Sequence, residues 1–350
     1  MKKQCVLGFY CYLCKQNCCV LKKILIIRFS SIGDIVLTTP VVRCVKQQVP
    51  DAELHFLTKA AYRSLLEVNP YVDKDYALEG SLSAVTQQLK AEHYDFVIDL
   101  HKNFRSLRVR LALCRPSASF PKLDFQKMLY TKLKIGHLPE IHIVDRYFKA
   151  VEKWGVKNDG QGLDFFFGEG DAVALDNLPS AFRAGFAAIV IGGQHATKIL
   201  PAEKVVEVCR SLHYPVVLIG GKEDRARGEM IREAIGNQVV NTCGELRLGQ
   251  SASLLRQAKV VLANDTGMMH IAAALRKPIV SVWGNTVPEF GMYPYLPTCP
   301  ENGCIIETKG LPCRPCHKLG YKQCPKGHFR CMNQLDAEAI ALAMRKMMEK

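Results

Sequence analysis

At 350 residues, with 48% hydrophobic and 23% charged residues, the chain has the composition of a soluble globular protein and is long enough for two domains. This composition excludes a disordered chain, and no apolar run reaches the length of a transmembrane helix. The net charge of +14 favours acidic partners such as nucleic acid, an anionic membrane surface or phosphorylated substrates, although solubility alone explains it about equally well.

The first 21 residues form a Cys-rich extension that we expect to be poorly ordered. They begin with Lys2 and Lys3 and include a short apolar stretch, but they lack the small-residue cleavage site of a signal peptide. An upstream start codon would also explain them, and weak membrane contact is an open alternative. Further along, the isolated Cys44, Cys114, Cys209 and Cys243 suit a reducing compartment.

The first half of the chain alternates buried strands with helices. Its apolar runs predict strands at residues 22–28, 53–57 and 95–99, and a helix at residues 35–48. Elements at this spacing are typical of a parallel sheet with helices on both faces, in which ligands bind outside the carboxyl ends of the strands. The residues that topology places at this ligand-facing edge are Ser30, Ser31, Gly33, Asp34 and His101.

A less regular region separates the first half from the second. Residues 116–145 are basic and irregular, and residues 157–179 are rich in Gly, Asp and Asn. Because this composition favours turns over helices and strands, residues 157–179 are the predicted interdomain connection.

A second series of strands and helices follows. Its expected elements are strands at residues 187–191, 216–219, 260–263 and 279–283, and helices at residues 201–213, 268–275 and 336–350. The chain therefore predicts an α/β protein of two successive doubly wound halves.

Gly-rich turns follow three successive strands of the second half, at Gly192-Gly193, Gly220-Gly221 and Asp265-Thr266-Gly267. Backbone N–H groups in such turns and at helix N-termini favour a bound phosphate. Lys198 adds a mobile charge suited to a diphosphate, and His270 could reach the same anion. Glu223 or Asp224 could accept hydrogen bonds from ribose hydroxyls. Any one turn could serve the fold alone, but three at one sheet edge favour a nucleotide site.

Neither G-x-G-x-x-G nor a Walker A motif occurs, so the usual dinucleotide and P-loop signatures are missing. Asp34 is the candidate base of the first half, because a carboxylate facing the nucleotide across a cleft could take a proton from an attacking hydroxyl. Its spacing alone favours a simpler interpretation, in which an acidic residue in the first turn of a helix stabilises the helix dipole.

Four cysteines near the C-terminus, Cys313, Cys316, Cys324 and Cys331, have the spacing C-x₂-C-x₇-C-x₆-C. Four thiols at short spacing suggest a structural zinc site, although this is not the spacing of a standard zinc ribbon. Disulfides, or cysteines packed without metal, explain the cluster nearly as well.

Two motifs found together resemble the family-9 glycosyltransferases, the heptosyltransferases that build the inner core of bacterial lipopolysaccharide. The motifs are Arg28-Phe-Ser-Ser-Ile-Gly-Asp34 with its continuation to Pro40, and Asn264-Asp-Thr-Gly-Met-Met-His270. Residues 99–106 are similar to a further family segment. The resemblance implies a GT-B architecture, in which two Rossmann-like domains face each other across a cleft and a last helix returns to the first domain.

The resemblance also implies a division of the chain and a reaction. Residues 1–21 would be an extension, 22–160 the acceptor-binding domain, 161–180 a linker, 181–334 the donor-binding domain with the Cys cluster, and 335–350 the C-terminal helix. The implied reaction is inverting transfer of a heptose from ADP-heptose to an acidic, phosphorylated lipopolysaccharide acceptor, without a catalytic metal. The enzyme would be cytoplasmic, with peripheral contact to the inner membrane and no nucleic-acid partner.

Carried onto matching positions, the family pattern makes Asp34 the general base, Lys198 the diphosphate contact and Asp265 a contact to the donor sugar. The further candidate donor contacts are Thr197, Glu223, Asp224, Thr266, Gly267 and His270. The candidate acceptor contacts are Ser31, Gly33, His101 and Arg105. Fixed N–H groups, a helix N-terminus and Lys198 would stabilise the leaving ADP where other glycosyltransferases use a metal.

Two alternatives remain open. One is a GT-B relative that uses another nucleotide-sugar, for example a sugar-nucleotide epimerase. The other is a non-catalytic basic protein that binds nucleic acid or membrane, although the chain lacks interleaved aromatics and a recognised nucleic-acid module.

Overall fold

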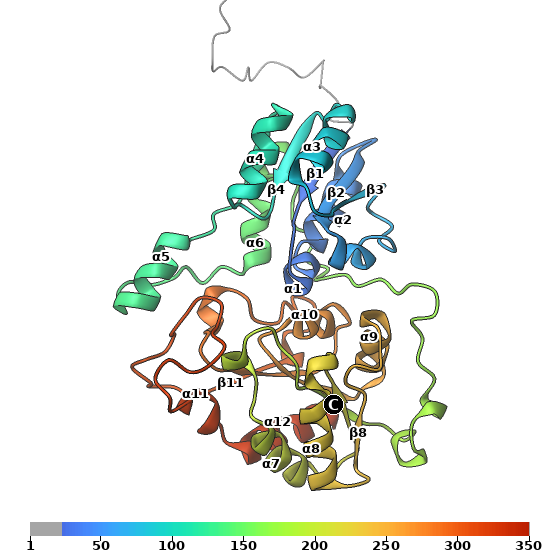
Figure 1. The fold of residues 1–350 in the computed structure, drawn as a ribbon, viewed down its shortest axis with the longest axis vertical. Coiled ribbons are helices and arrows are strands. Elements are labelled where there is room, and N and C mark those ends of the chain that lie inside the picture. Colours follow the sequence, from blue (N-terminus) through green and yellow to red (C-terminus); the bar gives the residue numbers. More distant parts are fainter. Residues whose placement is uncertain (1–22, 350) are drawn as a thin grey trace, which may run out of the picture.

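The computed structural model describes residues 23–349, so the expectation for the N-terminal extension lies outside the described residues. Two parallel sheets, each flanked by helices, lie one above the other in Figure 1. The predicted α/β class with two doubly wound halves is therefore confirmed. No helix among residues 23–349 combines the length and the apolar character needed to cross a bilayer.

The first sheet has the order β3-β2-β1-β4-β5, and every described pairing within it is parallel. Its strands are β1 (Lys23–Ile27), β2 (Glu53–Lys59), β3 (Lys74–Leu78), β4 (Phe96–Asp99) and β5 (Ser117–Ser119). Its helices are α1 (Ile32–Val36), α2 (Thr39–Gln48), α3 (Leu82–Ala91), α4 (Phe104–Leu113), α5 (Asp124–Met128) and α6 (Ile143–Phe148). β1 is central and almost wholly buried, as its continuous apolar sequence predicts.

The single helix predicted at residues 35–48 is in fact two helices, α1 and α2, with a break at Leu37 and Thr38. The hydroxyl of Thr38 donates to the carbonyl of Ile35 at 2.7 Å, and the hydroxyl of Thr39 donates to the carbonyl of Val36 at 2.7 Å. These side chains compete with the backbone for carbonyls, and Pro40 has no N–H to continue the ladder. The prediction of one helix here was wrong for this reason.

The second sheet has the order β11-β10-β9-β6-β7-β8 and is also parallel. Its strands are β6 (Ala187–Val190), β7 (Val216–Ile219), β8 (Val239–Asn241), β9 (Val260–Asn264), β10 (Ile279–Trp283) and β11 (Gly303–Glu307). Its helices are α7 (Ala202–Leu212), α8 (Arg225–Ile235), α9 (Leu248–Gln257), α10 (Gly267–Ala274), α11 (Arg330–Asn333) and α12 (Ala337–Met348).

The last helix, α12, does not return to the first half, which corrects the expectation drawn from the GT-B pattern. It packs on α7, β9 and β10, and its apolar side chains, including Ile340 and Met344, are buried in the core of the second half. The side chain of Asp336 caps it by accepting from the backbone N–H of Glu338 at 2.9 Å. An amphipathic pattern predicts a helix but cannot tell which of two cores its apolar face covers.

The basic region predicted to be irregular, residues 116–145, contains β5, α5 and the start of α6. The segment at residues 121–141, which includes α5, projects from the body of the molecule in Figure 1, and we call it the arm. Between α6 and β6 the chain holds only short 3₁₀ turns, and the guanidinium of Arg43 binds this connection through Asp159, Gly162 and Asp164. The domain boundaries themselves stay a prediction.

Candidate active site

In the first sheet the strand order reverses between β1 and β4, so the loops that follow these two strands flank a topological switch point. The loop after β1 carries Arg28 and leads into α1, and the loop after β4 carries His101. The aromatic ring of Phe29 contacts the His101 ring edge to face, with centroids 5.1 Å apart. The structure thus brings together the two strand ends that the sequence placed at a ligand-facing edge.

Asp34 lies in the first turn of α1, and its carboxylate is held on both oxygens. Arg28 Nη2 lies 2.7 Å from Oδ1, while the backbone N–H and the hydroxyl of Ser31 each donate to Oδ2 at 3.0 Å. Loss of solvent would raise the pKa of Asp34, but the Arg28 charge and the hydrogen bonds from Ser31 outweigh it and lower the pKa below its usual range. With about a quarter of its side chain exposed, Asp34 is an ionised carboxylate that a ligand can reach.

His101 is half-buried beside this carboxylate, and its Nδ1 has no hydrogen-bond partner among the described residues. Burial, with help from the charges of Arg28 and Lys122, lowers the pKa of His101 to about 3, so its ring is neutral at pH 7. The predicted acceptor contact Arg105 instead lies exposed on α4, and no ion pair joins it to a described residue. Of the predicted acceptor contacts, Ser31, Gly33 and His101 lie at the site, whereas Arg105 does not.

In the second sheet the order reverses between β6 and β9, and the loops after these strands carry Lys198 and Asp265. Lys198 Nζ lies 2.6 Å from Asp265 Oδ2, and the hydroxyl of Thr286 donates to the same oxygen at 2.8 Å. The Asp265 side chain is 9% exposed and that of Lys198 is 17% exposed. The Lys198 ammonium therefore forms an ion pair with the buried carboxylate of Asp265, next to the N-terminus of α10.

The N-termini of α1 and α10 meet where Gly33 faces Gly267. A Cβ on Gly267 would lie 3.0 Å from the backbone nitrogen of Gly33, and a Cβ on Gly33 would lie 2.6 Å from Cδ2 of His270. His270 is buried between the two halves, its Nδ1 lacks a partner among the described residues, and burial lowers its pKa to about 4. Thr266, which precedes α10, likewise has a buried hydroxyl without a described partner. Unsatisfied polar atoms of this kind mark a place for a polar ligand.

Two predicted donor contacts have side chains already engaged in the fold. The Thr197 hydroxyl accepts from the backbone N–H of Tyr321 at 2.8 Å and so anchors the Cys-rich segment. Asp224 is buried, accepts from the backbone N–H of Gly221 at 2.9 Å and pairs with Arg227 at 3.1 Å. Glu223, in contrast, is exposed after β7. The geometry therefore leaves Glu223, not Asp224, available to a nucleoside.

Arg28 and Thr286 are the residues of this site whose contacts the sequence interpretation missed. Arg28 directly follows β1, and Thr286 follows β10, so both stand after the carboxyl end of a strand. The same topological rule that selected Asp34 and Asp265 could have selected them.

The four cysteines of the predicted zinc site are not arranged as metal ligands. Cys316 Sγ donates to the carbonyl of Cys313 at 3.0 Å, and Cys313 Sγ lies 3.8 Å from Nε2 of His328. Within residues 23–349, no three of these thiols and nearby imidazoles place their ligand atoms within 4.8 Å of one another. All four are free thiols in this structure, and zinc binding stays a prediction.

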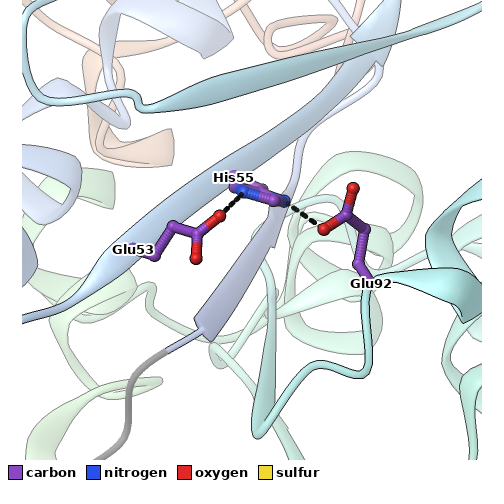
Figure 2. Close-up of side chains that lie close together, drawn as sticks. All are labelled: Glu53, His55 and Glu92. Carbon is purple, nitrogen blue, oxygen red and sulfur yellow. Dashed lines mark hydrogen bonds and ion pairs between the residues drawn. The ribbon is translucent and has the colours of Figure 1, made fainter.

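One other cluster has metal-like spacing, formed by Glu53, His55 and Glu92 (Figure 2). Glu53 lies 2.8 Å from Nε2 of His55, and Glu92 lies 4.0 Å from Nδ1. The ammonium groups of Lys23 and Lys74 already bind Glu92, at 2.8 and 2.6 Å. The cluster lies where strands begin: Lys23 is the first residue of β1, Glu53 of β2 and Lys74 of β3. It therefore occupies the amino edge of the first sheet, opposite the edge that carries Asp34. We interpret it as a structural ion-pair network.

Residues 82–321 match the model of glycosyltransferase family 9 (heptosyltransferase). The chain belongs to this family. The match includes the switch point of the second sheet and the His101 loop of the first. A family-9 chain is a glycosyltransferase, so the two facing sheet edges belong to an enzyme.

The chain is similar to lipopolysaccharide heptosyltransferase 2 of Escherichia coli (strain K12), with 25% identity over 304 residues that span 77% of this chain and 84% of that protein. The solved E. coli ADP-heptose lps heptosyltransferase II aligns with a TM-score of 0.68 at 22% identity, covering 93% of this chain and 98% of that one. E. coli heptosyltransferase WaaC with ADP aligns with a TM-score of 0.66 at 21% identity, over 93% of this chain and 99% of that one. At these identities the structural matches establish the GT-B fold of this family-9 chain.

Proposed function

We propose that this family-9 enzyme moves a heptose from ADP-heptose to a lipopolysaccharide inner-core acceptor, with inversion and without a catalytic metal. The observation that carries the proposal is the pairing of two switch points, one holding the ionised carboxylate of Asp34 and the other holding Lys198 at the N-terminus of α10. The relatives named above, which act on or bind the same donor class, support the choice of sugar and nucleotide.

Asp34 would act as the general base on the acceptor hydroxyl. A base must be ionised when the acceptor arrives, and Arg28 and Ser31 keep the pKa of Asp34 low. A weak base suffices for this step, because the acceptor proton becomes acidic only as the new bond to the anomeric carbon forms. Attack from the side of Asp34, opposite the leaving diphosphate, inverts the configuration at that carbon.

The second half would stabilise the negative charge that develops on the leaving ADP. The backbone N–H groups at the start of α10 are fixed donors, and the Lys198 ammonium lies near the same sheet edge. When the diphosphate binds, Lys198 would move from Asp265 toward the phosphates, which frees the Asp265 carboxylate to accept from donor-sugar hydroxyls. Glu223 would accept from the ribose.

The acceptor would be an acidic, phosphorylated glycolipid at the cytoplasmic face of the inner membrane. The net charge of +14 supports a negatively charged acceptor. His101, Ser31 and Gly33 border Asp34 and are the proposed acceptor contacts.

The test is transfer by Asp34→Asn with ADP-heptose and a lipopolysaccharide inner-core acceptor on which the unmodified chain is active. We expect its kcat to fall by about 10²- to 10⁴-fold, while calorimetry gives an unchanged affinity for ADP. Asp176→Asn, an exposed carboxylate in the connection, is the matched control and should keep full activity. Normal turnover by Asp34→Asn would remove Asp34 from the mechanism. Retention of configuration, or epimerised donor without acceptor, would reject the proposed reaction.

A further inference from the structure

Most of the large apolar side chains that are exposed in residues 23–349 belong to one stretch, residues 104–141. On a typical surface such side chains are scattered singly. Here Phe104 is 75% exposed and Leu111 is 70% exposed on α4, and Ile135 is 62% exposed on the arm. We call this surface the apolar face; its members are Phe104, Leu107, Leu111, Phe125, Met128, Leu133, Ile135 and Ile141.

On α4 the apolar face follows helical spacing. Phe104, Leu107 and Leu111 recur at i, i+3 and i+7, so they lie on one side of the helix. Val109 and Leu113 on the other side are buried against the sheet. The helix therefore has two apolar sides, and only the inner one is needed to hold it in the fold.

The arm carries the rest of the apolar face and starts beside α4. Lys122 Nζ donates to the carbonyl of Lys102 at 3.0 Å, which fastens the root of the arm two residues before Phe104. Figure 1 shows α4 and α5 on the same side of the molecule, with the arm projecting outward. The two parts are thus joined at their base.

The charge of this stretch is strongly positive. Residues 104–141 contain eight lysines and arginines, and only Asp124 and Glu140 as acids. Of the cations on α4, Arg110 lies 3.7 Å from Asp99, while Arg105 and Arg108 form no ion pair within residues 23–349. Exposed apolar side chains next to unpaired cations match a surface with negative charge outside and hydrocarbon beneath it. A nucleic acid would use the cations and leave the apolar side chains unexplained.

We propose that the apolar face, with the cations around it, docks on the surface of a bilayer that contains anionic lipid. The position of the apolar face fits delivery of a lipid-linked acceptor, and that fit is the one part of the proposal that rests on the proposed function. Two members of the apolar face on α5, Phe125 and Met128, also line a cavity of about 390 Å³ together with His317 and Lys318 of the second half. Lys127, which lines this cavity, has its Nζ 5.4 Å from the ring centroid of Phe290 in the second half. The cavity therefore lies between the arm and the second half.

The experiment is co-sedimentation of the full chain with vesicles of phosphatidylcholine, alone or mixed with phosphatidylglycerol. We expect binding to the mixed vesicles that weakens as NaCl is added, because screening reduces the attraction to anionic lipid. Phe104→Ser with Leu111→Ser should weaken binding about tenfold or more, and Arg108→Glu about fivefold at low salt. Met230→Ser on α8, 58% exposed and outside this face, is the matched control and should bind like the unmodified chain.

Thermal unfolding of each variant shows whether it still folds. If the Phe104/Leu111 variant does not fold, Arg108→Glu still tests the proposal. Equal binding to both vesicle types, or unchanged binding by both the Phe104/Leu111 and the Arg108 variants, would overturn the proposal. So would sedimentation velocity showing that the face joins two copies of this chain and that the resulting dimer does not bind vesicles. Because vesicle binding needs no donor or acceptor, failure here leaves the proposed reaction untouched.

Discussion

The chemistry of Asp34 is set by its immediate neighbours rather than by its position in a helix. An acidic residue in a first turn stabilises the helix dipole, and on spacing alone that was the favoured interpretation. The structure adds a cation, Arg28, on one oxygen and two donors from Ser31 on the other. These contacts could not be predicted from the sequence, because they depend on how the loop after β1 folds back over α1.

A first prediction concerns the pH dependence of transfer. The pKa of Asp34 is lowered, so the base stays ionised as the pH falls, and kcat/KM should decline only below about pH 4. Ser31→Ala removes the hydroxyl donor to the carboxylate, which raises the pKa of Asp34 and should move this acid limb to higher pH. Ser30→Ala is the control, and pH–rate profiles of the two variants give the comparison. An identical acid limb in both would show that Ser31 does not tune the base.

A second prediction concerns Lys198, whose ammonium forms an ion pair with Asp265. Lys198→Met should weaken binding of ADP by about 10- to 100-fold, because a charge-assisted contact to the diphosphate is lost. Binding of adenosine should change little, since it has no phosphate for Lys198 to contact. Calorimetric titration with both ligands measures the difference. Equal losses for the two ligands would mean that the substitution disturbs the nucleoside pocket instead.

At the scale of elements, the strands that the sequence predicted are the central ones. Val216–Ile219 and Ile279–Trp283 were predicted with their observed bounds, because strands covered on both faces are continuous apolar runs. The missed strands, β3, β5, β8 and β11, are the two edges of each sheet. Edge strands are less covered and so carry polar residues, as in the Ser-Ala-Ser sequence of β5, which leaves no apolar pattern to detect.

A third prediction concerns the contact between α1 and α10. Gly267→Ala would place a Cβ 3.0 Å from the backbone nitrogen of Gly33, which forces the two helix ends apart. Since displacement of reacting groups by about 1 Å can cost about 100-fold in rate, we expect a loss of that order in kcat with little change in thermal stability. Gly303→Ala on β11, where the nearest atom is 3.4 Å away, is the matched control. Full activity of Gly267→Ala would show that catalysis does not require this close approach.

At the scale of the whole molecule, the two halves contact each other at the site, and the segment that connects them is also bound to the first half. Arg43 on α2 is almost wholly buried and donates to Asp159 at 2.8 Å and to the carbonyl of Gly162 at 2.9 Å. Its ion pair with Asp164 completes the attachment. Composition predicted where the connection lies, but not that one arginine holds its start against the first half.

A fourth prediction follows from that attachment. Arg43→Met leaves Asp159 and Asp164 without their cation, so the free energy of unfolding should fall by about 3–5 kcal/mol. Arg63→Met, which breaks the ion pair of an exposed arginine with Asp75, should cost far less, because solvent screens an exposed pair. Urea denaturation of both variants gives the two values. Similar losses would mean that Arg43 contributes no more than a surface pair.

The place of α12 has a consequence for how the chain can be divided. Because this helix completes the core of the second half, each sheet with its helices is built from one uninterrupted stretch of sequence, and within residues 23–349 the backbone passes between them once. Cutting a single peptide bond in the connection would therefore yield two fragments, each with a complete sheet and one side of the site. Mixed together, such fragments could regain transfer only through non-covalent reassembly, and the concentration needed would measure how strongly the halves hold each other.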